Sequence, residues 1–194
     1  MEHNEILKEF TDAESILKGH FILSSGLHSD TYMQCARVLM EPRRSKKLCA
    51  ELAKRVLYVL KNKKIDLVVS PAMGGVIVGY EMACQLNVPN IFCERVDGKL
   101  VLRRGFDIKE NSNILIVEDV ITTGKSSLET IECIKPYKVN ILAEACLVNR
   151  SNNINLGLPI ISLLDLDIKS YEANNLPESL KNIPAIKPGS RWIK

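Results

Sequence analysis

The stretch Ile114–Ser126 reads ILIVEDVITTGKS, and it decides the fold class. It opens with a short apolar run rich in β-branched residues, 114–117, which is typical of a strand buried on both faces. Helical spacing follows over 126–134. A buried strand that leads through a short loop into a helix is the unit from which parallel α/β sheets are built.

The rest of the chain repeats this alternation of strand and helix. Apolar runs between turn residues predict further strands at 67–69, 91–93 and 141–148, and helical spacing predicts helices at 45–60 and 76–86. The first of these helices follows Pro42, and its apolar residues fall on one face: Leu48, Leu52, Val56, Val59 and Leu60. We therefore predict an α/β fold with a central, mostly parallel sheet flanked by helices. Ligands of such sheets bind beyond the carboxyl ends of the strands.

Composition narrows the class of protein. The chain has 194 residues, 46% hydrophobic and 25% charged, with a net charge of +3, which suits a single globular domain over 1–194. No apolar run approaches the ~20 residues of a membrane span, and the first ten residues lack the apolar core of a secretory signal. The six cysteines and three histidines lack the spacing of a disulfide framework or a zinc site. No basic stripe carries interleaved aromatic residues. We expect a cytoplasmic protein that binds neither membranes nor nucleic acid.

The residues after the apolar run carry the chemistry. Glu118 and Asp119 are adjacent carboxylates, which are costly to bury without hydroxyl groups, cations or a metal nearby. The next residues offer hydroxyl groups and a glycine that lets the backbone approach a ligand, and the helix start offers free N–H groups for a phosphate. This combination indicates a ribose-phosphate site. An ordinary capped helix start remains the alternative, whereas a P-loop is excluded because that motif requires Gly at position 119.

Ile114–Ser126 resembles the phosphoribosyl-pyrophosphate (PRPP) motif of type I phosphoribosyltransferases, in which apolar residues precede two acids and a TTG-type loop. The resemblance implies the type I phosphoribosyltransferase fold, with a small amino-terminal hood, mainly 1–40, and a core of about 41–165. It implies that Glu118 and Asp119 hold the ribose hydroxyls and that Asp119 is also catalytic. The rest of the implied PRPP site, around the 5-phosphate, consists of Val120, Ile121, Thr122, Thr123, Gly124, Lys125 and Ser126.

Three further stretches resemble the orotate phosphoribosyltransferases. Residues 19–32 are similar to their hood segment F-x-L-x-S-G-x-x-S-x-x-Y, although a polar loop between two short strands is the alternative. A glycine pair after the strand at 67–69 predicts an anion nest. The resemblance makes it the pyrophosphate loop, formed by Ala72, Met73, Gly74 and Gly75. Arg150 ends a predicted strand, where its planar fork suits a carboxylate, and the resemblance assigns Arg150 and Thr122 to orotate.

Residues 93–106 contain four basic side chains and two glycines. The family has a flexible basic loop at this place, which closes over the site from the partner subunit and implies a homodimer. By the resemblance, Arg95 binds pyrophosphate and Lys99 is the catalytic lysine.

The sequence also departs from the family. Many members have lysine at the positions of Ser24, Gly74 and Val96, and a histidine usual in the basic loop is missing. Arg103 and Arg104 are candidates to replace the lost positive charge. A shorter branch of orotate enzymes has a similar loop containing L-R-R-G-F and ends in a K-P-G-S-R tail, which residues 187–191 resemble.

The resemblance implies transfer of the 5-phosphoribosyl group from PRPP to orotate, which gives orotidine 5′-monophosphate and pyrophosphate in de novo pyrimidine (UMP) biosynthesis. Mg²⁺ is the implied cofactor, carried by PRPP and not by protein ligands. Two alternatives stay open. In a purine or xanthine phosphoribosyltransferase the base would leave Arg150 without a partner. A PRPP-sensing regulator without catalysis would need a nucleic-acid-binding domain, for which the ~18 residues ahead of Gly19 are too few.

Overall fold

The computed structural model of the protein describes residues 1–23, 26–150 and 154–188. Its centre is a six-stranded sheet in the order β5-β4-β3-β6-β7-β8, in which every neighbouring pair is parallel except β4 and β5. The strands are β3 (Leu67–Pro71), β4 (Asn90–Val96), β5 (Lys99–Leu102), β6 (Asn113–Ile121), β7 (Asn140–Asn149) and β8 (Ile160–Asp165).

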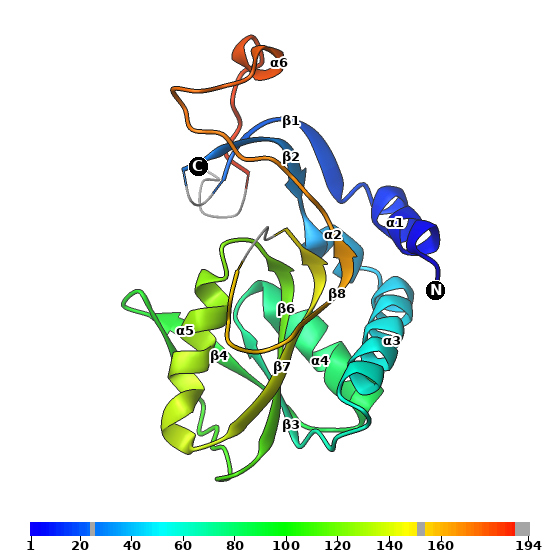
Figure 1. Cartoon of the computed structure of the whole chain (residues 1–194), viewed down its shortest axis with the longest axis vertical. Helices are drawn as coiled ribbons and strands as arrows, with labels where there is room; N and C mark the ends of the chain where they lie inside the picture. Colours follow the sequence, from blue (N-terminus) through cyan, green and yellow to red (C-terminus); the bar gives the residue numbers. More distant parts are fainter. Residues whose placement is uncertain (24–25, 151–153, 189–194) are drawn as a thin grey trace.

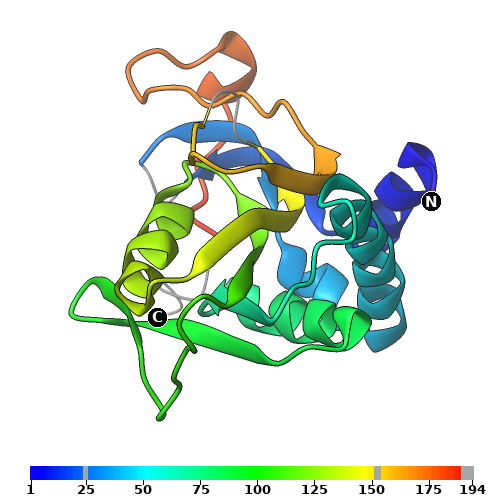
Figure 2. The same ribbon diagram turned by 60° about the horizontal axis from the view of Figure 1, so that its bottom comes forward.

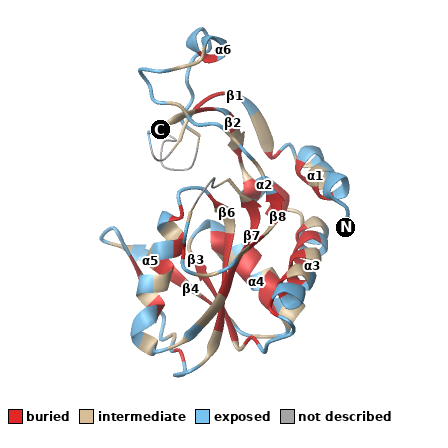
Figure 3. Cartoon of the chain, viewed as in Figure 1, coloured by how far each residue is buried: buried red, intermediate tan, exposed pale blue. Residues whose placement is uncertain are grey.

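Helices cover both faces of this sheet (Figures 1 and 2). The helices α3 (Pro42–Val59) and α4 (Gly74–Leu86) pack on one face, whereas α5 (Lys125–Ile134), followed by the short 3-10 helix η1 (Lys135–Tyr137), packs on the other. Each face has its own hydrophobic core, and the buried sides of the helices turn inward (Figure 3). The predicted α/β fold with a mostly parallel sheet is confirmed.

Most elements extend beyond the predicted ranges, and for two boundaries the structure shows the physical reason. The helix α3 begins at Pro42, because the Glu41 carboxylate caps it by accepting hydrogen bonds from the backbone N of Arg43 at 3.1 Å and of Arg44 at 2.8 Å. The predicted buried face was wrong in one place, since Val59 is 46% exposed. The strand β6 continues through both acids to Ile121, because its hydrogen bonds to β7 persist to that residue.

The hood is a two-stranded hairpin that lies beyond the sheet (Figure 1). It consists of β1 (Ile16–Ile22) and β2 (His28–Met33), between α1 (His3–Asp12) and α2 (Cys35–Leu39). The end of the chain, which includes α6 (Glu178–Lys181), pairs with both strands of this hairpin. Tyr171 forms an antiparallel bridge with His28, and Ile186 a parallel bridge with Phe21. The hood therefore joins the first and last parts of the described chain.

A pair of histidines connects the hairpin to the same C-terminal part of the chain, the tail that contains Tyr171, α6 and Ile186. His20 is 4% exposed, and its Nδ1 lies 2.8 Å from the carbonyl oxygen of Ile183. Its Nε2 lies 2.6 Å from Nδ1 of His28 on the neighbouring strand. Buried polar groups of this kind fix one arrangement, because each nitrogen would be costly to leave unpaired.

The expected basic loop begins as a second hairpin. Asp97 and Gly98 have positive φ values of 48° and 82°, which a two-residue turn of type I′ requires. Val96 then pairs with Lys99, and β5 runs back along β4 at the edge of the sheet. Within the described ranges, no helix is long and apolar enough to cross a membrane. All six cysteines are free thiols.

Candidate active site

Three chain segments meet at one edge of the sheet: the loops that follow β3 and β6, and the end of β7 (Figure 1). The strands β3, β6 and β7 are parallel neighbours, so their carboxyl ends lie side by side. This is the edge at which open α/β sheets bind ligands. The predicted PRPP motif, the predicted pyrophosphate loop and Arg150 are thereby brought together.

The two acids of the motif lie near the carboxyl end of β6, followed only by Val120 and Ile121. Glu118 is 8% exposed, and its carboxylate accepts a hydrogen bond from the backbone N of Asp119 at 3.2 Å. Asp119 in turn accepts one from the backbone N of Val120 at 2.9 Å. Burial raises the pKa of both carboxyl groups, and the neighbouring Asp119 raises the pKa of Glu118 further. The pair therefore holds one negative charge more readily than two.

The loop between β6 and α5 offers backbone donors to a ligand. Gly124 is the residue ahead of α5 and has φ +68°, a conformation that L side chains rarely adopt. Because it has no side chain, it cannot cap the helix, and within the described ranges this helix start has no side-chain cap, which leaves its first N–H groups available to a ligand. Thr122 and Thr123 are exposed ahead of it; after it, Lys125 is exposed and Ser126 is half-buried. These groups form a nest suited to a phosphate.

The loop between β3 and α4 comes close to Asp119. A Cβ atom at Gly74 would lie 2.7 Å from a carboxylate oxygen of Asp119, which is closer than real atoms pack. At Gly75 it would lie 3.1 Å from the carbonyl oxygen of Val117. In this chain the Asp119 carboxylate thus occupies the space that a side chain at position 74 would need.

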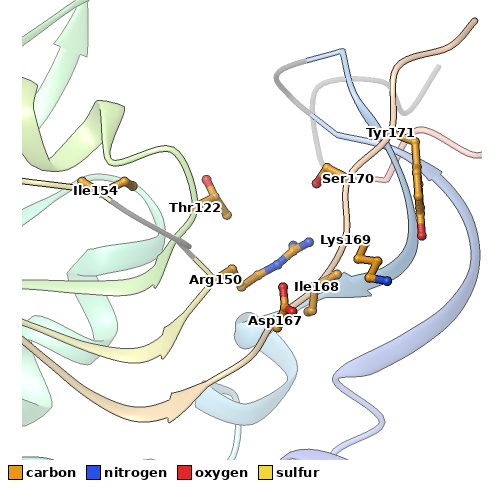
Figure 4. Close-up of a pocket in the computed structure, with 8 residues that line it drawn as sticks. All are labelled: Thr122, Arg150, Ile154, Asp167, Ile168, Lys169, Ser170 and Tyr171. Atoms are coloured by element: carbon orange, nitrogen blue, oxygen red, sulfur yellow. The ribbon is translucent and has the colours of Figure 1, made fainter. Parts of the chain in front are cut away.

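Arg150 borders a cavity of about 400 Å³. Figure 4 shows its guanidinium group directed from the end of β7 towards the segment that carries Lys169 and Ser170, with Thr122 beside it. Its Nε is buried and has no hydrogen-bond partner among the described residues. Burial lowers the pKa of Arg150, which shows that its charge is poorly solvated. A half-buried guanidinium that lines a cavity is suited to an anionic group of a ligand.

Sequence reasoning missed part of this cavity. Its wall includes a run from the tail: Asp167, Ile168, Lys169, Ser170 and Tyr171, together with Ile154. Tyr32 does not line the cavity but lies near enough to Asp119 and Arg150 to interact with their charges. Burial and the charge of Asp119 raise its pKa, while Arg150 lowers it, so its hydroxyl lies in the field of both. Tyr32 closes the hood motif and could have been found, whereas no spacing in the sequence marks 167–171.

Two arginines in and beside the β4–β5 hairpin form ion pairs with glutamates. Arg95 forms an ion pair with Glu129 on α5 and donates to the carbonyl oxygen of Gly98. Arg104 pairs with Glu94 at 2.6 and 3.0 Å and lies 5.6 Å from the centre of the Phe92 ring. Lys99, at the start of β5, is exposed and is not among the residues that line the cavity beside Arg150.

Several predicted features fall elsewhere. Val96 ends β4, and Arg103 is exposed beyond β5. Ser24 and the tail residues 189–191 lie outside the described residues, so the structure says nothing about their roles.

Known proteins share both the sequence and the fold of this chain. The model of the phosphoribosyl transferase domain matches residues 39–156. A protein of Sphingopyxis alaskensis named orotate phosphoribosyltransferase is 50% identical over 195 residues, which is 100% of this chain and 99% of the relative. A protein of the same name from Caldicellulosiruptor saccharolyticus is 46% identical over 100% of both.

A solved structure shows the same fold at greater distance. The crystal structure of orotate phosphoribosyltransferase from Aeropyrum pernix matches with a TM-score of 0.68 and 22% identity, over 83% of this chain and 93% of that chain. Adenine phosphoribosyltransferases share the fold as well, with a TM-score of 0.65 and 17% identity for one of them. Fold similarity alone therefore does not distinguish the acceptor base, but the full-length sequence identity does. The chain belongs to the phosphoribosyltransferase family, and within it to the orotate phosphoribosyltransferases.

Proposed function

We propose that the protein transfers the 5-phosphoribosyl group from PRPP to N1 of orotate, giving orotidine 5′-monophosphate and pyrophosphate in pyrimidine biosynthesis. One observation carries the choice of acceptor. Arg150, which is half-buried and whose Nε has no hydrogen-bond partner among the described residues, lines a cavity next to the proposed PRPP site, and orotate has a carboxylate that its guanidinium can bind. The names of the full-length relatives support the same reaction.

The carboxyl edge of the sheet supports the proposed binding of PRPP. Glu118 and Asp119 accept hydrogen bonds from the ribose hydroxyls, and the open N–H groups at the start of α5 bind the 5-phosphate. The pyrophosphate lies along 72–75, where Gly74 and Gly75 leave the backbone bare. Arg150 and Thr122 then orient orotate from the other side. Catalysis rests on holding the two reacting atoms in line and on stabilising the charge of the departing pyrophosphate.

The phosphate oxygens of PRPP suit Mg²⁺, a hard cation that prefers oxygen ligands and retains water. Among the described residues, no three His, Cys, Asp or Glu side chains are grouped so that they could hold a metal ion by themselves. We propose that Mg²⁺ binds with PRPP, where it would neutralise charge on the pyrophosphate. Asp119 would hold the ribose beside it.

Arg95 and Lys99 are proposed to reach the pyrophosphate when the β4–β5 hairpin moves. In the described conformation Arg95 pairs with Glu129, so binding requires that ion pair to be exchanged for the ligand. An exposed pair of this kind is worth only ~0–1 kcal/mol, which an anionic ligand can outweigh. We further propose a cytoplasmic homodimer in which the hairpin serves the partner's site.

The test is a comparison of acceptors. Purified protein with PRPP and Mg²⁺ receives orotate, uracil, hypoxanthine, xanthine or adenine, and pyrophosphate release is measured. We expect turnover with orotate alone. In Arg150→Ala, kcat/KM for orotate should fall by on the order of 100-fold, because a desolvated charge pair is lost.

A matched control separates this contact from a general loss of arginine. Arg55 is also partly buried, and it donates to the carbonyl oxygens of Ser162 and Leu163, at 2.9 and 3.0 Å, away from the site. Arg55→Ala should lower stability but keep the preference for orotate. Turnover with a purine would overturn the acceptor. Binding of PRPP without turnover of any base would indicate a PRPP sensor.

A further inference from the structure

Glu144 is a carboxyl group buried in the sheet beneath α5. It lies on β7 with 0% exposure, between Ile116 on β6 and Ile160 on β8. The hydroxyl of Ser127, in the first turn of α5, donates to Oε1 of Glu144 at 2.7 Å. The second oxygen, Oε2, is buried and has no hydrogen-bond partner among the described residues. Because a bare buried carboxylate oxygen is costly, this environment favours the protonated form.

The surrounding groups do not supply a compensating positive charge. Burial raises the pKa of Glu144 to about 7, and the hydrogen bond from Ser127 opposes that rise. The titratable groups that face it are Glu118 on β6 and Cys146 on β7. Burial raises the pKa of both, and the charge of Glu144 adds to the effect. Asp119 and Asp165 lie further along the same edge and act on Glu118 and Cys146 in the same direction. From α5 the contact is the neutral hydroxyl of Ser127.

Glu144 is connected to the proposed phosphate nest through a single residue. Ser127 directly follows 122–126, the loop and first helical residues that we assign to the 5-phosphate. It is 1% exposed, so its hydrogen bond to Glu144 attaches the start of α5 to the sheet. An ionised Glu144 would oppose a phosphate at the end of that helix by charge repulsion, whereas a neutral one would not.

We propose that Glu144 is a positioning residue for PRPP, and that the protein binds PRPP more tightly when the Glu144 carboxyl carries its proton. The proposal rests on the assignment of the PRPP site above. It adds a residue that contacts neither the substrate nor the reacting atoms, and that acts through Ser127 and α5.

The sign of the effect follows from linkage. The pKa of Glu144 in the folded protein, about 7, lies above the 4.5 of an unperturbed glutamate, so the native state retains the proton up to about pH 7. A bound phosphate raises this pKa further, and PRPP binding therefore takes up a proton near pH 7. By reciprocity, PRPP affinity is highest below that pH and falls as Glu144 ionises. A shift of one unit on binding corresponds to about a tenfold change in affinity.

The experiment measures the Kd of Mg²⁺–PRPP by titration calorimetry, without orotate, between about pH 6 and about pH 8.5. We expect the Kd of the native protein to rise about 3- to 10-fold across this range relative to the Kd of Glu144→Gln. The glutamine variant keeps an acceptor for Ser127 but cannot ionise. Because the ratio of the two proteins is used, titration of PRPP itself cancels.

Two further variants distinguish a titrating group from a structural one. Ser127→Ala removes the bond that lowers the pKa of Glu144, so the midpoint of the pH profile should move to higher pH. Thr130→Val is the matched control, since this buried hydroxyl bonds to the carbonyl oxygen of Ser126 within α5 and should leave the midpoint unchanged. If Glu144→Gln does not fold, the shift in Ser127→Ala decides.

The outcomes separate the two proposals. Equal pH profiles in the native protein and in Glu144→Gln, or an unmoved midpoint in Ser127→Ala, would overturn the role of Glu144 while PRPP still binds. Absence of PRPP binding at every pH would instead overturn the proposed function.

Discussion

Two strand–helix junctions form the floor of the site, and they have opposite chemistry. The β6–α5 junction presents acids and hydroxyl groups, whereas the β3–α4 junction, from Pro71 to Gly75, contains no charged side chain. The two are not independent, because the Asp119 carboxylate lies where a side chain at Gly74 would be. The β6–α5 junction supplies the polar groups, and the β3–α4 junction, which has glycine at position 74, leaves space for the Asp119 carboxylate. A residue of either loop is therefore understood only together with its neighbour across the sheet edge.

The largest expected effect comes from removing charge at the β6–α5 junction. Asp119→Asn keeps the shape of the side chain but removes its negative charge, so kcat/KM for PRPP should fall by on the order of 10²- to 10³-fold. Steady-state kinetics with varied PRPP measure this. Asp66→Asn is the control, because Asp66 accepts a hydrogen bond from the backbone N of Asn113 at 3.0 Å, at the other end of β6. A similar loss in both variants would mean that the effect is structural.

A smaller effect is expected from filling space at the β3–α4 junction. In Gly74→Ala the new methyl group would meet Asp119 at 2.7 Å, so the carboxylate must move. We expect KM for PRPP to rise about tenfold, with a smaller change in kcat, since about 1–3 kcal/mol of overpacking is typical.

A double-mutant cycle sharpens this comparison. If Gly74 acts through Asp119, then Gly74→Ala should add little to the defect of Asp119→Asn, because contacting residues are not additive. Full additivity of the two losses would show that the junctions work separately.

The smallest effect on PRPP binding is expected one turn further into α4. A Cβ atom at Gly79 would lie 1.9 Å from the hydroxyl of Ser70 on β3, so Gly79→Ala should destabilise the fold by about 1–3 kcal/mol. Thermal unfolding measures the loss, and Ser70→Ala in the same chain should restore part of it. KM for PRPP should stay within about twofold; a larger rise would mean that helix packing, and not only the loop, controls the site.

The sheet and the PRPP motif were predictable, because both are encoded by local patterns. Apolar runs located β3, β4, β6 and β7, and the acids followed by Thr122–Ser126 located the ligand edge. The extension of β6 to Ile121 was not predictable, since it depends on hydrogen bonds to β7, whose paired residues lie 27 or 28 positions later in the chain. The hairpin turn at Asp97 and Gly98 was predictable, because Asp-Gly is a preferred pair for a two-residue turn. The resemblance to a family with a flexible loop at this place led to a loop prediction instead.

The cavity wall at 167–171 shows a different limit. Its residues have no periodicity that sets them apart, and they reach Arg150 only because the tail pairs with the hood. The buried contact between His20 and Ile183 spans 163 residues, a distance over which single-sequence patterns carry no signal. Glu144 was not predicted as a functional residue, although it lies within a correctly predicted strand. A single acid in the apolar run 141–148 does not show that one of its carboxylate oxygens is buried without a partner among the described residues.

The pairing of tail and hood also has a consequence for how the molecule assembles. Ser29 donates to the carbonyl oxygen of Lys169 at 2.9 Å, across 140 residues of chain, and Ile22 donates to Ile186 at 2.8 Å. Contacts of such long sequence separation form slowly, because a large loop must close first. During synthesis the strands β3 to β8 leave the ribosome before the tail does, so the proposed PRPP-binding edge can become ordered first and the cavity wall beside Arg150 last. Pulse-labelled hydrogen exchange should show amides of β6 protected before those of β1.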